Sequence, residues 1–345
     1  MQLTIFSILL PVLFILAFVK PKTTVYLLII SLTLQVSSVF NIGEYSMQIY
    51  RFITVVLSLV FLLKIIKNGF ILRLQSVYVK SIFVIGVLFA FYSLVISLLA
   101  PLIFEGYLVF PPELGIDFSA IYGASPLVFN VYNVAFPIYI ILYILTLGYI
   151  GSLKWEEEDI INLKKSLDVS LLVVIITSIS QILTYSFGIF DVTKIFYTIT
   201  TREFKYSFIA DFLPLPRIQA TYLEPSMLSP FLIGFYSMYL YNMINKRILE
   251  IKYLFIFVIL FVITLFTTST TAYVSLLLIT LIILFYANTF SLIRSNIVVK
   301  LNLIRNLLYI TLTLIMFFFI VSFVLNLNDI FKIIVYYLSG ILGFT

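Results

Sequence analysis

The sequence predicts an all-α polytopic membrane protein with about ten transmembrane helices and a long outer loop before the seventh. Two observations carry this prediction. Hydrophobic residues make up 63% of the 345 residues and charged residues only 10%, and the mean hydropathy is +1.19. A soluble domain is about half apolar and about a quarter charged. The second observation is a series of apolar stretches of about 20 residues, the length at which a helix crosses a bilayer.

The predicted spans follow one another as a single integral membrane domain over residues 1–345. They lie at 3–19, 23–40, 49–66, 81–104, 127–149, 169–190, 229–245, 253–267, 272–290 and 306–326. The first apolar stretch lacks a basic leader and a small-residue cleavage site. We therefore expect it to be retained as a span and not removed as a signal peptide.

Basic residues between the spans predict the orientation. When successive connections are assigned to alternate sides, 15 of the 21 Lys and Arg residues fall on one side, which is therefore expected to be cytoplasmic. The loops at 105–126 and 191–228 then lie outside. Segment 151–168 is acidic first and basic later, an order that suits the dipole of a short amphipathic surface helix, with a solvated connector as the alternative.

The net charge of +6 is accounted for by this orientation signal, so no nucleic-acid partner is expected. The chain has no cysteine and no histidine. Disulfide and thiolate chemistry are therefore excluded, together with the commonest general base and the commonest transition-metal ligand. The sequence also has no phosphate-binding glycine loop and no metal-ligand spacing, so we expect no cofactor and no metal. Glu113 and Asp117 could still hold a divalent ion weakly.

Polar residues within the predicted spans are few and uncharged. Gln35, Asn130, Asn133 and Gln181 could line a path through the membrane. A proton relay needs a ladder of acidic residues through the spans, and the sequence has none. Ion-coupled transport is disfavoured for this reason.

The segment "LPRIQATYLEPSMLSP" places charges at the mouth of the predicted seventh span. Arginine on the outer side departs from the positive-inside bias, and its planar charged fork suits a phosphate. If a helix begins at Pro225, Glu224 or Ser226 can cap it. Arg217 precedes Glu224 by seven residues, so the two could share a helix face. Alternatively, Arg217 reaches the lipid head groups and Glu224 is only a cap.

The rest of the outer loop 191–228 adds further charges and aromatic rings, and we expect it to fold as a lid over the outer face. Arg202 and Lys205 could hold a diphosphate as a pair, or they could be solvated loop charges. Tyr206 and Tyr222 could stack against sugar rings, or they could belong to the aromatic belt at the membrane interface.

A cluster of hydroxyl side chains occurs in "LFTTSTTAYVSLL", from Leu265 to Leu277. It predicts either a tight turn, a packing contact between helices, or a polar break that faces a cavity. In the last case Ser269 would contact the substrate.

The stretches "RIQATYLEPSMLSPFLIGFY" and "FTTSTTAYVSLLLITLIIL" resemble the O-antigen polymerase and O-antigen ligase superfamily. The resemblance is to the Wzy-type oligosaccharide repeat-unit polymerases in particular. The first stretch carries an arginine, a short aromatic stretch and "EP" before a span. The second is similar to the serine/threonine-rich hairpin that follows in the family. The span layout extends the likeness over most of the chain.

This resemblance implies a GT-C-like integral membrane glycosyltransferase of the bacterial cytoplasmic membrane. It would polymerise undecaprenyl-diphosphate-linked oligosaccharide repeat units at the outer face, for capsule, exopolysaccharide or O-antigen. Membrane lipids and other polysaccharide-assembly proteins, namely a flippase and a chain-length regulator, are the implied partners. Ligases in the superfamily depend on a histidine in a later outer loop, so its absence favours a polymerase. Family members usually continue beyond the point where this chain ends, so we expect either a short or a C-terminally truncated member.

Sugar transfer from a lipid diphosphate needs no metal if cations stabilise the leaving group. We assign Arg217 to that role, assisted by Arg202 or Lys205. The acceptor hydroxyl should lose its proton to a carboxylate. The candidates, in order of preference, are Glu224, Asp211 and Glu113. In the alternative, Glu224 positions Arg217 and Asp211 is the base. The candidate substrate-binding residues are Arg202, Lys205, Tyr206, Tyr222, Ser226 and Ser269.

Two other functional classes compete with this interpretation. A lipid-linked oligosaccharide flippase or polysaccharide exporter would share the substrate, but it would need charges lining the interior from one side to the other. An integral membrane acyltransferase would normally call for a histidine base, which the chain lacks.

Overall fold

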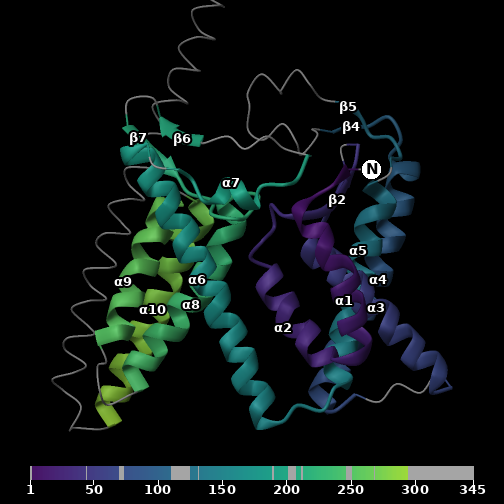
Figure 1. Ribbon diagram of the computed structural model, residues 1–345, viewed down its shortest axis with the longest axis horizontal. Coiled ribbons are helices and arrows are strands. Elements are labelled where there is room, and N and C mark those ends of the chain that lie inside the picture. The colour runs from purple at the N-terminus through teal and green to yellow at the C-terminus, as the bar shows by residue number, and fades with distance from the viewer. Residues whose placement is uncertain are drawn as a thin grey trace, which may run out of the picture. The chain divides into compact units, whose positions relative to one another are not determined.

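The computed structural model describes residues 2–43, 45–69, 74–109, 125–130, 132–188, 190–200, 207–210, 213–245, 251–267 and 269–293. This part of the chain is mostly helical (Figure 1). Within the described residues, four helices are long and apolar enough to cross a membrane, which indicates a membrane protein. They are Ile49–Lys67, Val77–Ile103, Asn133–Ser152 and Glu157–Tyr185. The chain divides into two compact units, which are described separately below.

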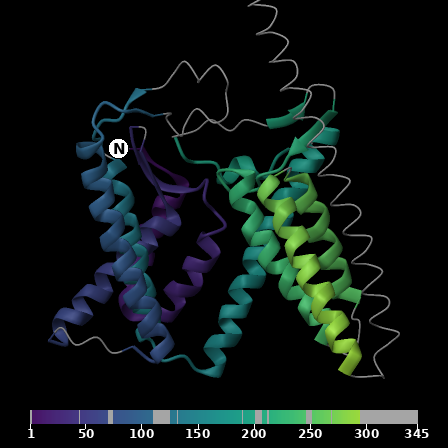
Figure 2. The same ribbon diagram turned by 180° about the vertical axis from the view of Figure 1, so that it is seen from behind.

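Unit 2 consists of residues 5–30 and 47–166. Its elements are η1 (Ile5–Ile8), α1 (Leu9–Val19), α2 (Pro21–Ser31, whose last residue belongs to unit 1), α3 (Ile49–Lys67), α4 (Val77–Ile103), β4 (Leu108–Val109), β5 (Ser125–Pro126), α5 (Tyr132–Ser152) and the first turns of α6 (Glu157–Phe187). α3 and α4 both pack against α5 (Figure 2). Hydroxyl groups join α3 to α5, because Ser58 Oγ donates to the Leu142 carbonyl at 2.8 Å and lies 3.1 Å from Thr146 Oγ1. Such bonds are a common means of joining helices in lipid.

Glycines let the helices of unit 2 approach closely. A Cβ added to Gly148 on α5 would lie 2.5 Å from Phe83 Cε2 and 2.7 Å from Phe61 Cε1. One added to Gly151 would lie 2.3 Å from Val79 Cγ1. Small residues that admit a neighbouring helix are typical of helix interfaces in membranes.

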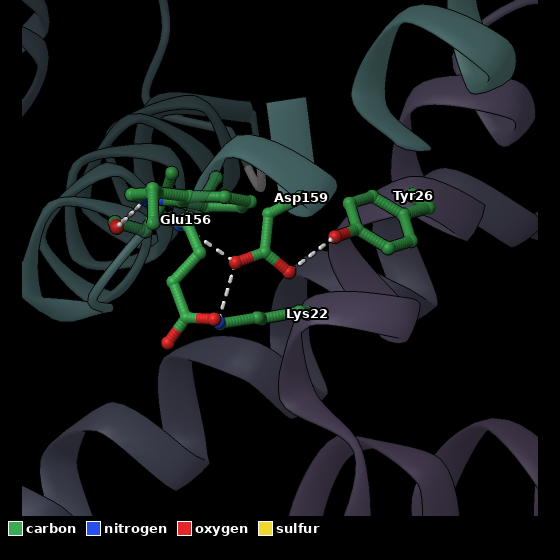
Figure 3. A network of polar contacts seen from close by, with 6 residues as sticks. Lys22, Tyr26, Glu156 and Asp159 are labelled. Atoms are coloured by element: carbon green, nitrogen blue, oxygen red, sulfur yellow. Dashed lines mark hydrogen bonds and ion pairs between the residues drawn. The ribbon is translucent and has the colours of Figure 1, made fainter. Parts of the chain in front are cut away.

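A polar network joins α2 to the start of α6 (Figure 3). Lys22 Nζ lies 2.5 Å from Asp159 Oδ2, and the Tyr26 hydroxyl donates to Asp159 Oδ1 at 3.0 Å. The backbone N–H of Glu156 also donates to Asp159 Oδ2, at 2.9 Å, so Asp159 caps the helix N-terminus. The hydrogen bond from Lys22, with that from Glu156, lowers the pKa of Asp159. Its carboxylate is therefore ionised at neutral pH.

Unit 1 consists of residues 1–4, 31–46 and 167–345. Its elements are β1 (Gln2–Leu3), β2 (Ser38–Ile42), β3 (Tyr45–Gln48, of which Met47 and Gln48 belong to unit 2), the rest of α6, α7 (Thr193–Phe196), β6 (Ser207–Ala210), β7 (Leu213–Arg217), α8 (Pro225–Asn245), α9 (Ile251–Phe266) and α10 (Thr270–Ile293). β1, β2 and β3 form one small sheet in that order, and β6 pairs with β7 in an antiparallel hairpin. α8, α9 and α10 lie side by side (Figures 1 and 2).

The core of unit 1 is apolar and rich in aromatic rings. Tyr236 of α8 stacks on Phe257 of α9, with ring centroids 4.6 Å apart. A second cluster brings the 218–222 segment against buried residues of α6, α8 and α9, including Val174, Leu228 and Leu260. The segment that follows Arg217 is therefore part of the core.

Two sequence predictions need correction. The span predicted at 23–40 is not one helix, because α2 ends at Ser31 and β2 begins at Ser38. Ser37 Oγ donates to the Phe196 carbonyl at 2.8 Å and Ser38 N–H donates to Thr198 Oγ1 at 2.8 Å. These polar groups bond to a distant segment instead of continuing the helix.

The separate surface helix predicted at 151–168 is also wrong. α5 extends to Ser152, and α6 begins at Glu157 and runs without a break to Phe187. The sequence of α6 contains no glycine or proline that would end the helix after the charged turns. The predicted acidic start is confirmed, since Glu157, Glu158 and Asp159 occupy the first turn of α6. The predicted span at 306–326 lies outside the described residues.

Candidate functional site

Arg217 and Glu224 lie at the two ends of a tight turn between a strand and a helix. β7 ends at Arg217 and α8 begins at Pro225. The N–H of Ile218 donates to the Phe266 carbonyl at 3.0 Å, which joins the turn to the end of α9. Ile218 is 1% exposed, whereas the side chain of Arg217 is exposed. The guanidinium therefore projects to the surface from a backbone that its buried neighbour fixes.

The amide of Gln181, on α6, holds the middle of this turn. Its Oε1 accepts from the backbone N–H groups of Ala220 at 2.9 Å and Gln219 at 3.2 Å. Its Nε2 donates to the Ala220 carbonyl at 3.2 Å and to Thr193 Oγ1 at 3.4 Å. Ala220 has a φ of 50°, which a non-glycine residue rarely adopts, and these bonds stabilise it there. Gln181 is 3% exposed, so its amide has little access to water in place of these partners.

The segment that follows α2 holds the same turn from another side. Thr221 Oγ1 donates to the Thr33 carbonyl at 2.5 Å, and the N–H of Val36 donates to the Thr221 carbonyl at 3.2 Å. Thr33 and Thr221 are both fully buried. The turn between Arg217 and Glu224 is thus bonded to α6, to α9 and to the 33–36 segment, all within unit 1.

Glu224 caps the N-terminus of α8. The N–H groups of Met227 and Leu228 donate to its backbone carbonyl at 3.0 and 3.3 Å. Ser226 Oγ donates to Glu224 Oε2 at 3.2 Å. α8 begins at Pro225, four residues before the predicted span at 229–245, which meets the condition for Glu224 to cap it. The positive end of the helix dipole also favours a negative charge at this position.

The hydroxyl cluster forms the tight turn between α9 and α10. α9 ends at Phe266 and α10 begins at Thr270. Thr267 Oγ1 donates to the Thr264 carbonyl at 2.7 Å, and the hydroxyl of Tyr273 donates to the Leu265 carbonyl at 2.9 Å. These bonds satisfy carbonyl groups that the end of α9 would leave without partners. The bond from the N–H of Ile218 to the Phe266 carbonyl places the residue after Arg217 beside the end of α9, where this connection begins.

The predicted helix face shared by Arg217 and Glu224 is wrong. Arg217 is the last residue of a strand and Glu224 precedes the first residue of α8, so no helix carries both. The turn at Ala220 changes the direction of the chain between them. In the part of the chain that the structure describes, the ion pair is Lys22–Asp159, and Arg217 forms none with Glu224.

Two of the predicted substrate-binding residues are enclosed. Tyr222 is 4% exposed, and its ring lies against that of Phe231, with centroids 5.9 Å apart. Burial raises the pKa of the Tyr222 hydroxyl, which therefore stays neutral at physiological pH. Ser269 is 3% exposed. The prediction that Tyr222 stacks against a sugar is wrong for this structure, because the core of unit 1 takes up its ring.

Several predicted site residues lie outside the described residues. They are Glu113, Arg202, Lys205, Tyr206 and Asp211. Among the residues that the structure does describe, no group of three or more acidic side chains is placed to hold a metal ion.

The part played by Gln181 was not predicted from the sequence. A glutamine within an apolar helix indicates a buried polar contact or a polar path, and the sequence supports both interpretations equally. The contact joins Gln181 to residues 38 and 39 positions away along the chain. No local pattern could have identified that partner.

No family model, no curated protein and no solved structure matches the chain.

Proposed function

We propose that the chain is a membrane glycosyltransferase that polymerises oligosaccharide repeat units carried on undecaprenyl diphosphate, at the outer face of the bacterial cytoplasmic membrane. In this proposal it has about ten spans with a GT-C-like arrangement. The observation that carries the proposal is the placement of Arg217. Arg217 is exposed, and the N–H of the next residue, Ile218, is bonded to the end of α9, where the hydroxyl-rich connection to α10 begins. Glu224 is at the other end of the same turn.

The chemistry needs one cation, one carboxylate and no redox step. The acceptor hydroxyl of one lipid-linked unit attacks the anomeric carbon of another, and the bond from that carbon to the diphosphate oxygen breaks. Negative charge then grows on the leaving diphosphate, where the fork of Arg217 can bind two oxygens at once. The proton of the acceptor passes to a carboxylate, for which Glu224 is the first candidate and Asp211 the second. Other assembly proteins would supply the substrate and set the chain length.

The rigidity of the turn supports this role. A cation helps a transition state most when it is already in place and needs no reorganisation during the reaction. The bonds from Gln181, Thr33 and Phe266 hold the backbone on which Arg217 stands. An arginine that served only to reach lipid head groups would not require this support.

Polymer length on a gel tests the proposal. A strain whose own polymerase gene is deleted is complemented with wild type, Arg217→Lys, Arg217→Ala or Glu224→Gln, each at equal membrane abundance. We expect Arg217→Ala to reduce polymer formation on the order of 100-fold, leaving single repeat units on the lipid. Arg217→Lys should also fail, because a point charge cannot replace the two-point contact.

Lys194→Ala is the matched control. Lys194 is an exposed cation in the same predicted outer loop, and it lies on α7. Full-length polymer from this variant would show that loss of a loop charge alone is tolerated. Full-length polymer from both Arg217 variants would sink the proposal. If single units then also failed to reach the outer leaflet in the deletion strain, a flippase or exporter would be the better assignment.

A further inference from the structure

Arg51 lies among tyrosine side chains at the start of α3. Its Cζ is 4.6 Å from the centroid of the Tyr139 ring and 5.8 Å from that of Tyr50. Its Nε donates to the Tyr50 hydroxyl at 3.2 Å. Tyr143, one helical turn after Tyr139 on α5, is near enough to interact electrostatically with both Tyr50 and Arg51. We call these four residues the Arg51 cluster. All of them belong to unit 2.

The cluster orients a cation without neutralising it. A tyrosine ring attracts a guanidinium through its π face and leaves the edge of the fork available. The fork carries five N–H donors, of which one contacts the Tyr50 hydroxyl and another can contact that of Tyr143, so most of the donors stay available. Within the described residues, the ion pair is between Lys22 and Asp159, and no carboxylate pairs with Arg51. A partly buried arginine of this kind retains its full positive charge and several donors for a ligand.

The position of the cluster identifies the chemistry of that ligand. Arg51 is in the first turn of a helix that is apolar enough to cross a membrane. Tyr139 is in the first half of another such helix, and Tyr143 lies just past the midpoint of that helix. α3 and α5 begin at the same end of unit 2, since Arg51 contacts Tyr139 and Lys64 contacts Tyr149 and Ser152. The ends of membrane helices lie at the level of the lipid head groups. The anion available at that level is a phosphate.

We propose that the Arg51 cluster binds the phosphate group of an anionic lipid. The guanidinium edge donates to the phosphate oxygens, and the tyrosine rings hold the guanidinium in the plane that this contact requires. The ligand is a bilayer phospholipid such as phosphatidylglycerol, or a polyprenyl phosphate, since both present the same group at the same depth. The residues of this cluster are different from those of the Arg217 site, and the proposal does not depend on the glycosyltransferase proposal.

Lys64 provides a matched control at the opposite end of the same helix. It is also a cation near a tyrosine, with its Nζ 5.8 Å from the Tyr149 ring centroid. It donates to Ser152 Oγ at 3.1 Å. An ammonium is a point charge without a fork, and it has one ring near it where Arg51 has two. If the lipid were held only by general attraction between basic residues and an anionic surface, substitution of Arg51 and substitution of Lys64 should weaken lipid binding equally.

The experiment measures lipid-dependent thermal stability of the purified full chain in an uncharged detergent. The unfolding temperature is followed while dioctanoyl phosphatidylglycerol, dioctanoyl phosphatidylcholine or a polyprenyl monophosphate is added. A ligand that binds the folded state raises this temperature, and the concentration at half the maximal shift reports the affinity. Wild type is compared with Arg51→Gln, Arg51→Lys and Lys64→Gln.

We expect Arg51→Gln to raise the half-effective phosphatidylglycerol concentration about tenfold, because the charged hydrogen bonds to phosphate are lost. Lys64→Gln should match wild type, and phosphatidylcholine should be the weaker ligand. Equal midpoints for wild type and Arg51→Gln would overturn the proposal, as would equal losses in Arg51→Gln and Lys64→Gln. If Arg51→Gln does not fold, an unchanged midpoint in Arg51→Lys would overturn it.

The same titration identifies the source of the phosphate. A lower midpoint for the polyprenyl monophosphate than for phosphatidylglycerol would make the carrier lipid the preferred ligand. The reverse order would make it a bilayer phospholipid. The titration does not measure the activity of the Arg217 site. If the lipid-binding proposal fails, the proposed glycosyltransferase function still stands. If the glycosyltransferase proposal fails, the lipid-binding proposal still stands.

Discussion

Among single residues, Gln181 has the clearest structural consequence. One amide satisfies the backbone on both sides of a strained alanine and thereby determines where Arg217 stands. A leucine of similar size would leave the N–H groups of Gln219 and Ala220 buried without this acceptor. Each such group costs about 1 to 3 kcal/mol when its partner is removed.

Gln181→Leu is therefore expected to reduce the free energy of unfolding by about 2 to 6 kcal/mol, because two backbone N–H groups lose their acceptor. Thermal unfolding of the purified chain measures this change. Thr184→Val is the control on the same helix, because Thr184 Oγ1 donates within its own helical turn, to the Ser180 carbonyl at 2.8 Å. If both variants unfold at the same temperature as wild type, the Gln181 contacts carry no net stability.

Asp159 gives a prediction with a defined dependence on pH. Its hydrogen bonds from Lys22, Glu156 and Tyr26 lower its pKa below the ordinary value of 3.8. A group with a lowered pKa in the folded state contributes stability above the unfolded pKa and loses it as the pH falls through the folded value. Asp159→Asn should consequently lower the unfolding temperature at pH 7, and the difference from wild type should shrink below pH 3.8.

The matched variant for this measurement is Glu158→Gln, which removes a neighbouring exposed carboxylate outside the Lys22 contact. It should unfold close to the wild-type temperature at both pH values. A difference between Asp159→Asn and wild type that is the same at pH 7 and at acid pH would show that charge pairing with Lys22 is not the cause.

At the scale of whole elements, glycine determines how closely the helices of unit 2 pack. The rings of Phe61 and Phe83 occupy the space beside Gly148, and Phe61 is only 1% exposed. Phe61 is buried and Phe83 is half-buried, so a methyl group added at Gly148 would force these rings to shift. Gly148→Ala is expected to cost about 1 to 3 kcal/mol through overpacking, although alanine favours a helix.

Gly234→Ala tests the opposite case on α8. Among the described residues, no atom of another segment lies within 4 Å of a Cβ added there, so the change acts through helix propensity. The free energy of unfolding should rise by up to about 1 kcal/mol. Comparing the unfolding temperatures of the two variants separates packing from propensity. A stabilising Gly148→Ala would mean that α3, α4 and α5 lie farther apart than the structure places them.

The elements also show where sequence reasoning succeeds. α3, α4 and α9 were predicted closely, because each is an apolar run with charges or turn residues at its ends. Hydropathy fails at 23–40 for a physical reason. It sums the apolar character of a stretch, but it takes no account of the bonds that Ser37 and Ser38 form with residues 196–198.

At the scale of the whole molecule, residue type predicted which side chains belong to the candidate site but not how the fold presents them. Arg217 and Glu224 were identified because charge is unusual beside an apolar span. The turn at Ala220 separates them, and its geometry depends on contacts with Gln181 and Thr33, which are distant in sequence. Long-range hydrogen bonds of this kind leave no periodic signal.

The orientation of the molecule in the membrane is a further property that sequence predicts, from the unequal distribution of basic residues. Lys194, on α7, is expected outside, and Glu158, at the start of α6, is expected in the cytoplasm. Both side chains are exposed.

The chain has no cysteine, so one introduced cysteine is its only thiol. A membrane-impermeant maleimide should therefore label Lys194→Cys in intact spheroplasts, and Glu158→Cys only after the membrane is permeabilised. The opposite pattern would place Lys194, and with it the loop that carries Arg217, on the cytoplasmic side. Polymerisation at the outer face would then be untenable, because the cation assigned to the diphosphate would face the wrong compartment.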